Sequence, residues 1–157
     1  MSSYIYRVLR STWGVYVAMN GSLRVVDKGA SPAGALSAAN FRLVLPNTPR
    51  FSQDELYWLR IGLGIAAAEA RTVVDQNSIV VIELEEVICP QLDYQPEGLG
   101  GALIGLVCEH FHLAVPNIQV RFDATANRYI FQFPDTADIT QPASSPTSRP
   151  KPGKSPT

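Results

Sequence analysis

The chain has 157 residues, of which 46% are hydrophobic and 17% are charged, and its formal net charge is −1. This length suits one domain with a substantial core, and the near-neutral charge argues against nucleic-acid binding, which favours a basic excess. No stretch approaches the roughly 20 consecutive apolar residues of a membrane span, and Met1–Arg10 contains no apolar run of signal-peptide length. We therefore expect a cytoplasmic protein without a membrane partner.

The charged fraction lies below the usual quarter of residues in globular proteins. A shortage of charge suggests that part of the surface is apolar and is covered by another chain. The composition therefore favours a homodimer or a complex with a protein partner.

The N-terminal third is rich in β-branched and aromatic residues. Tyr4–Leu9 is predicted to form a strand, and Asn20-Gly21 lies between two further strand-like segments, Gly14–Met19 and Leu23–Val26. Asn-Gly between alternating hydrophobic segments is the strongest short-range signal of a hairpin turn. The sequence therefore predicts a turn at Asn20-Gly21.

A helix is predicted to begin after Ser52. The preceding segment Asp27–Asn40 is rich in Gly, Ala, Ser and Pro and favours a mobile loop or a loosely wound short helix, and Phe41–Leu45 favours a strand. Ser52 and Glu55 have the spacing of a capping box, in which each side chain binds the other residue's backbone N–H. Apolar residues then recur every three to four positions, which predicts a helix to about Val74.

The next strand is predicted over Ile79–Ile88, with a bulge or a frayed edge near Glu85–Glu86, because the doubled acid interrupts the alternation. Pro96 suits the first turn of a second helix, where its missing N–H costs nothing, and Asp93 or Gln95 is the expected cap.

Three glycines of this second helix, Gly98, Gly101 and Gly105, would let another backbone approach closely. We expect the second helix to pack on the first through these glycines.

Two final strands, Ile118–Asp123 and Arg128–Phe133, flank Ala124-Thr125-Ala126-Asn127 and predict a hairpin. After it, residues 141–157 contain no aromatic or large aliphatic residue and five prolines, so they predict a disordered tail. Residues 1–140 are thus predicted to be one α+β domain of order β(3–4)-α-β-α-β-β. These elements predict a mostly antiparallel sheet with both helices packed on one face, because this arrangement buries the apolar sides of the sheet and the helices against one another.

The middle of the chain resembles the ribosomal protein S5 domain 2-like fold, and within it the fourth domain of bacterial elongation factor G. The resemblance lies in a capped helix containing Gly62-Leu63-Gly64-Ile65, the strand Val80–Glu85 and a small-residue helix through Leu103 to Phe111. It implies a fold and no functional residue, because no motif matches residue for residue. The chain also lacks the phosphate loop of the large GTPase that contains that domain.

Cys89, Cys108 and His112 are the candidate metal ligands. Cys108 and His112, four residues apart on a helix, would share a face, and Cys89 at a strand end could approach them to complete a three-ligand zinc site. The paired C-x-x-C spacing of strong zinc motifs is absent, which favours two buried, reduced thiols instead. The sequence predicts no metal and no other cofactor.

Asp93, Tyr94 and Glu97, before and at the start of the second helix, are the candidate catalytic residues. Two carboxylates there could act as acid and base if burial raised the pKa of one of them. Helix starts favour acidic residues for electrostatic reasons alone, so capping and complement of the helix dipole are the favoured interpretation of Asp93 and Glu97. Catalysis therefore stays open.

The leading hypothesis is a non-catalytic interaction or accessory protein that dimerises or docks through an open sheet face. The alternative is a small enzyme or small-molecule binder with a pocket between the loop at residues 27–40 and residues 93–97.

Overall fold

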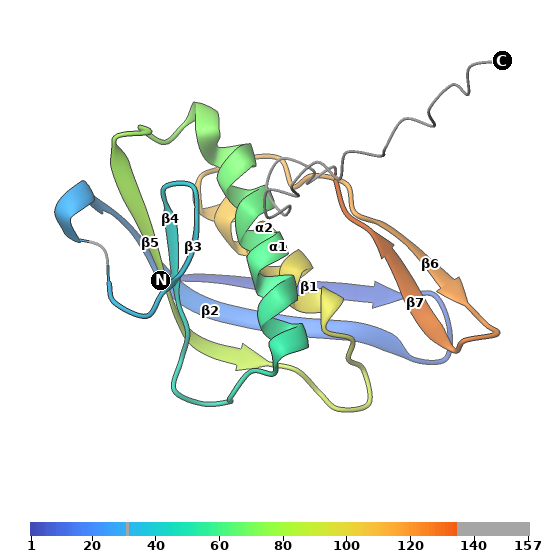
Figure 1. The fold of residues 1–157 in the computed structure, drawn as a ribbon. Coiled ribbons are helices and arrows are strands. Elements are labelled where there is room, and N and C mark those ends of the chain that lie inside the picture. Colours follow the sequence, from blue (N-terminus) through green and yellow to red (C-terminus); the bar gives the residue numbers. More distant parts are fainter. Residues whose placement is uncertain (31, 135–157) are drawn as a thin grey trace, which may run out of the picture.

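The computed structural model describes residues 1–30 and 32–134 and has an α+β fold (Figure 1). Two helices and a pair of 3₁₀ helices alternate with seven strands, and five of the strands form a mixed sheet of order β1-β2-β5-β4-β3. The predicted domain end near Thr140 and the predicted tail lie outside the described residues. In chain order the elements are β1 (Ser2–Leu9), β2 (Gly14–Asp27), η1 (Lys28–Ala30), β3 (Leu36–Ala38), β4 (Phe41–Val44), α1 (Gln53–Glu69), η2 (Ala70–Thr72), β5 (Ser78–Ile88), α2 (Glu97–His110), β6 (Gln119–Asp123) and β7 (Arg128–Gln132).

The predicted turn at Asn20-Gly21 is wrong, because β2 continues through it as one strand of 14 residues. The hairpin turn comes earlier, between Leu9 and Gly14, and β1 pairs with β2 from Ser2↔Gly21 to Leu9↔Gly14. Gly21 serves a close approach instead: a Cβ there would lie 2.6 Å from the carbonyl oxygen of Glu83 on β5. A glycine that marks a turn and a glycine that admits a neighbouring strand look alike in sequence.

The bulge predicted at Glu85–Glu86 is confirmed. The antiparallel register between β2 and β5 shifts there, with Asn20 opposite Glu86 and Gly21 opposite Leu84. Glu85 is therefore the extra residue of the bulge. It allows the side chains of Glu85 and Glu86 both to be exposed, while the other side chains of β5 keep their alternation between the two faces of the sheet.

The predicted capping box at α1 is also confirmed. Ser52 Oγ accepts from the Glu55 N–H at 3.2 Å, and Glu55 Oε2 accepts from the Ser52 N–H at 2.7 Å. The α-helix ends at Glu69, earlier than the predicted end near Val74, and continues as the 3₁₀ turn η2.

The start of α2 differs from the prediction. Pro96 is the residue before the first helical position, and no side chain caps that end. Asp93 and Gln95, the expected caps, have other partners: Asp93 Oδ1 accepts from the Gly14 N–H, and the Gln95 side chain binds the backbone of Tyr129. The side chains of Asp93 and Gln95 therefore bind distant backbone groups instead of the free N–H groups at the start of α2.

The three predicted contact glycines of α2 face the sheet, and not α1 as expected. A Cβ at Gly98 would contact Val15, and one at Gly101 would lie 2.8 Å from the ring of Tyr6. The helices approach each other through a different pair: a Cβ at Gly62 of α1 would lie 2.7 Å from the carbonyl oxygen of Gly100. Bulky rings on β1 therefore require the small residues of α2.

Both helices and the β6–β7 hairpin lie on one side of the five-stranded sheet (Figure 1). Helix α2 packs on β1 and β2, and α1 packs on α2 and on β3 and β4. The main core lies between the sheet and the helices and includes Met19, Phe41, Leu63, Ile82 and Leu103, each at most 1% exposed. The opposite side of the sheet has no such layer among the described elements.

Candidate interaction face

The side of the sheet opposite the helices is defined by strict alternation along β1. Ile5, Arg7 and Leu9 are exposed, whereas Tyr6 and Val8 between them pack toward the core. Alternation continues on β2, where Tyr16, Ala18 and Asn20 are half-buried and Val15, Val17 and Met19 are fully buried. Since successive side chains of a strand point to opposite faces, these exposed residues share one surface, which we call the open face.

An apolar row crosses the centre of the open face. Ile5 pairs with Ala18, and Ala18 pairs with Ile88 of β5, so the three side chains are direct neighbours on adjacent strands. Ile5 is 56% exposed and Ile88 is 44% exposed. Leu9, farther along β1 on the same face, is 62% exposed. Large aliphatic side chains that gather in this way commonly mark an interaction surface.

Charged groups of opposite sign flank this row. On one side, the Arg7 guanidinium lies over the ring of its cross-strand partner Tyr16, 5.3 Å from the ring centroid. On the other side, Asn20 Nδ2 donates to Glu86 Oε2 at 3.0 Å, and Glu86 is exposed. The open face therefore has a basic aromatic end, an aliphatic middle and an acidic end.

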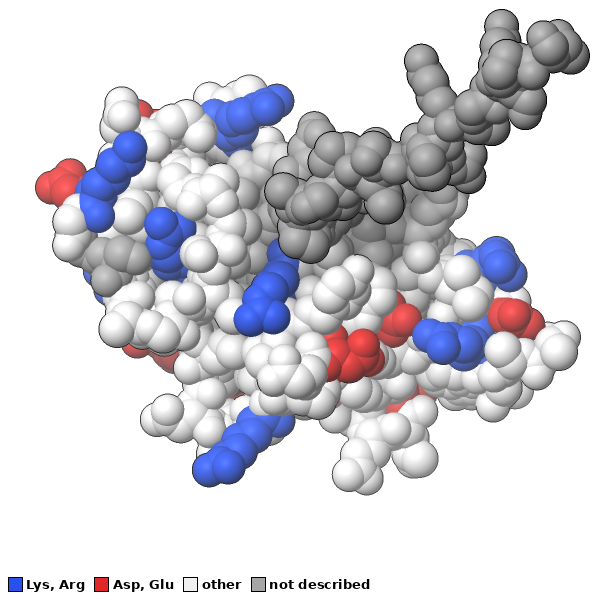
Figure 2. Space-filling model, viewed as in Figure 1, with Lys and Arg blue, Asp and Glu red and all other residues white. Residues whose placement is uncertain are grey.

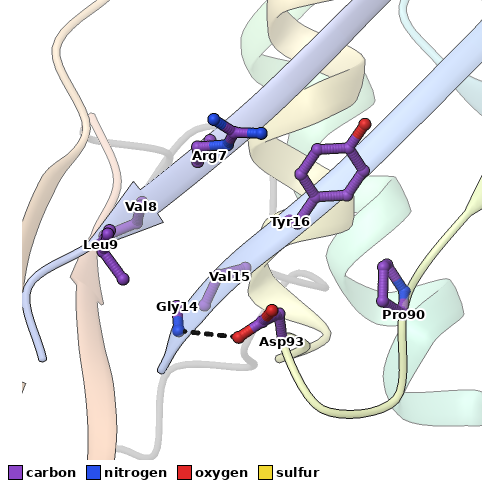
Figure 3. Close-up of a pocket in the computed structure, with 8 residues that line it drawn as sticks. All are labelled: Arg7, Val8, Leu9, Gly14, Val15, Tyr16, Pro90 and Asp93. Carbon is purple, nitrogen blue, oxygen red and sulfur yellow. Dashed lines mark hydrogen bonds between the residues drawn. The ribbon is translucent and has the colours of Figure 1, made fainter. Parts of the chain in front are cut away.

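A hollow of about 330 Å³ lies at the basic end, and Figure 3 shows the eight residues that line it. Arg7 and Tyr16 come from β1 and β2, and Pro90 and Asp93 come from the loop after β5. The Gly14 N–H donates to Asp93 Oδ1 at 3.0 Å, and the Tyr16 N–H donates to the Asp93 carbonyl at 2.9 Å. Asp93 thus continues the sheet ladder beyond the end of β5.

The three predicted catalytic candidates do not converge. Asp93 lines the hollow on the open face, whereas Glu97 lines a separate hollow with Trp13 and Trp58. The buried Glu97 carboxylate forms an ion pair with Arg128 at 3.0 Å.

The third candidate, Tyr94, donates its hydroxyl to Glu55 Oε1 at 2.6 Å. Burial raises the pKa of Tyr94 above its ordinary value, and the hydrogen bond to Glu55 raises it further. Each of the three side chains therefore has a contact that stabilises the fold.

The loop at residues 27–40 and residues 93–97 line different hollows. Ser37 and Ala38 border a groove together with α1, and Lys28 and Asn40 border a neighbouring hollow that includes Ile79. Neither of these two hollows includes a residue of the segment 93–97.

The candidate metal ligands are also placed apart. Cys108 is fully buried in a cluster with Ile61, Ile65 and Ile104, whereas Cys89 packs at the edge of the main core. Burial raises the pKa of both thiols to about 11, which keeps them protonated near neutral pH. Within residues 1–30 and 32–134, no group of three or more His, Cys, Asp or Glu side chains could hold a metal ion.

The strand aromatics do not form a common base-stacking surface. Tyr4 and Tyr6 pack toward α2, and burial raises the pKa of both phenols. Tyr129 is fully buried, and its hydroxyl donates to the Trp13 carbonyl at 2.6 Å. Tyr16, in contrast to these three tyrosines, lies on the open face.

Comparisons of the chain with protein-family models, with curated proteins and with solved structures find no match. The resemblance to the ribosomal protein S5 domain 2-like fold therefore stays a prediction. In the described part of the chain, no helix has both the length and the apolarity needed to cross a membrane.

Proposed function

We propose that this chain is a non-catalytic interaction protein that associates with a second copy of itself through the open face. The observation that carries the proposal is the apolar row of Ile5, Ala18 and Ile88, in which both isoleucines are exposed and which lies on the side of the sheet that no described helix covers. Burying half-exposed isoleucines contributes about 25 cal/mol for each Å² of apolar surface removed from water.

Self-complementarity of charge favours a second copy as the occupant. Arg7 and Glu86 lie on opposite sides of the apolar row, at opposite corners on β1 and β5. In a two-fold symmetric pair, each patch meets the same patch on the partner. Two sheets can pack face to face with their strands nearly at right angles. If two open faces stack in this way, Arg7 of each copy comes over Glu86 of the other.

The size of the face sets the expected strength. Three strands about 4.8 Å apart and six residues of about 3.3 Å each give a flat area of roughly 300 Å². Stable interfaces bury about 800 Å² on each partner, so this face alone predicts a weak, reversible dimer. We expect a dissociation constant on the order of 10–100 μM, equivalent to a binding free energy of about −5.5 to −7 kcal/mol.

Sedimentation velocity at a series of concentrations from about 5 to 500 μM tests this, because the range brackets the expected dissociation constant. The wild-type chain should shift from monomer to dimer as concentration rises. Ile5→Lys, which places a charge in the apolar row, should remain monomeric. Val73→Lys is the matched control, because Val73 is 52% exposed and lies outside the open face; it should dimerise like the wild type. A wild-type chain that stays monomeric at 500 μM contradicts the proposal.

A further inference from the structure

A groove of about 590 Å³ lies between α1 and β3, on the helix side of the sheet. One wall is a stripe of α1 and the turn after it, and the other is the end of β3 with the residues that follow it. The residues that line the groove include Ser37, Ala38, Tyr57, Arg60, Gly64 and Arg71. This groove is separate from the open face, so an inference about it goes beyond the proposed self-association.

The groove runs beside an edge strand. β3 is the last strand of the sheet and pairs with β4 from Leu36↔Leu43 to Ala38↔Phe41. Its other side pairs with no strand among residues 1–30 and 32–134. An edge strand presents backbone N–H and C=O groups with which an extended peptide can pair, the binding mode called β-strand addition.

The groove is positively charged. Arg60 and Arg71 are exposed at its border, and neither guanidinium forms an ion pair or hydrogen bond with a side chain of the described residues. No Asp or Glu lines the groove. Figure 2 shows Lys and Arg side chains over the region where β3, β4 and α1 lie, and acidic surface at the lower end of α1, where Asp54 and Glu55 form its first turn.

The two arginines mark the ends of an extended ligand. They are 11 residues apart along α1 and η2, which corresponds to about 16 Å at 1.5 Å per helical residue. In an extended peptide, residues i and i+4 are about 13 Å apart at 3.3 Å per residue, and the long arginine and glutamate side chains cover the remaining distance. Acidic residues at positions i and i+4 of such a peptide point to the same face, so their carboxylates can reach the two guanidinium groups.

From this geometry we infer that the groove between α1 and β3 binds an extended acidic segment of a partner protein. The segment adds a strand to the free edge of β3, and two carboxylates four residues apart bind Arg60 and Arg71. Small side chains at Ala38 and Gly64 leave room for the peptide backbone. A nucleic acid fits less well, because base stacking along a strand uses several aromatic rings and Tyr57 is the one aromatic ring in the lining.

The test is a titration of the ¹⁵N-labelled full chain with the peptide acetyl-Glu-Ala-Val-Ala-Glu-Val-amide, followed by NMR. We expect saturable shifts of the amides at residues 37–39 and of the side-chain Nε–H of Arg60 and Arg71, with a dissociation constant below about 1 mM. Arg60→Ala with Arg71→Ala should weaken binding at least tenfold, whereas Arg121→Ala, an exposed arginine on β6, should leave it unchanged.

Two further ligands separate backbone pairing from charge attraction alone. The same peptide with N-methylated amides at alternate positions keeps its charges but loses donors for a strand, and it should bind at least tenfold more weakly. An oligothymidylate of eight nucleotides should not compete with the unmodified peptide. Equal binding by the N-methylated peptide, competition by the oligonucleotide, or absence of shifts at residues 37–39 would each overturn the inference.

Discussion

Gly105 of α2 and Tyr4 of β1 are in such close contact that a Cβ on Gly105 would lie 2.0 Å from Cε1 of the Tyr4 ring. Two more ring atoms of Tyr4, Cζ and Cδ1, would lie within 2.5 Å of the same Cβ. The whole ring would therefore have to move off the helix to admit a methyl group. This contact fixes the distance between α2 and the sheet.

Gly105→Ala should accordingly lower the free energy of unfolding by about 1–3 kcal/mol, the usual cost of overpacking a tight contact. On helix propensity alone the same change would stabilise by about 1 kcal/mol. Urea unfolding distinguishes the two signs. In a Tyr4→Ala background the ring is gone, so Gly105→Ala should there be neutral or stabilising; an equal loss in both backgrounds would show that the ring is not the cause.

Gln95→Ala should weaken the attachment of the β6–β7 hairpin to the rest of the domain. The Tyr129 N–H donates to Gln95 Oε1 at 2.6 Å, and Gln95 Nε2 donates to the Tyr129 carbonyl at 3.0 Å. Both residues are buried, so truncation leaves two backbone groups without partners and should cost about 2–4 kcal/mol.

Thermal or urea unfolding monitored by tryptophan fluorescence measures this, because Trp13 packs edge-on against Tyr129. Gln132→Ala, an exposed position on the same hairpin, is the control and should change stability by less than about 0.5 kcal/mol. Equal stabilities of the Gln95→Ala and Gln132→Ala variants would contradict the anchoring role of Gln95.

His110 should make the fold less stable in mild acid. Burial lowers the pKa of His110 below its ordinary value, and the amino terminus and His112 add to the shift. The native state therefore binds fewer protons than the unfolded state around pH 6.5, so this group's contribution is present above that pH and is lost as the pH falls.

Chemical unfolding at several pH values between 7.5 and 5 should show a smaller loss of stability in His110→Gln than in the wild type. Carboxylates contribute equally to both proteins, so the difference between the two curves isolates His110. Identical pH dependence in the two proteins would show that His110 titrates alike in the folded and unfolded chain.

The sequence predicted those elements whose signals are local. The capping box of Ser52 and Glu55, the bulge at Glu85 and the final hairpin all follow from residues within a few positions of one another. The prediction of a turn at Asn20-Gly21 was wrong because the same dipeptide suits both a turn and a strand that is closely approached by the backbone of a neighbouring strand. The partner that distinguishes the two, Glu83, lies 62 residues later in the chain.

The candidate interaction face was predictable only as an expectation that an open sheet face would exist. Ile5, Ala18 and Ile88 become neighbours through the β1–β2 and β2–β5 registers, and a misplaced turn at Asn20 conceals both registers. Asp93, Tyr94 and Glu97 stood out because of their chemical type. Their actual partners, Gly14, Glu55 and Arg128, come from three different elements or loops.

In the proposed dimer, two copies meet through their open faces with Arg7 of one over Glu86 of the other. Arg7→Glu alone and Glu86→Arg alone each place like charges in contact across the two-fold axis, so each variant should be monomeric. Mixing the two variants restores both opposite-charge pairs. Sedimentation equilibrium of the mixture should therefore show a 1:1 heterodimer with wild-type affinity within about threefold, equivalent to about 0.7 kcal/mol. A mixture that remains as monomeric as its separate components, or single variants that dimerise like the wild type, would contradict the claim.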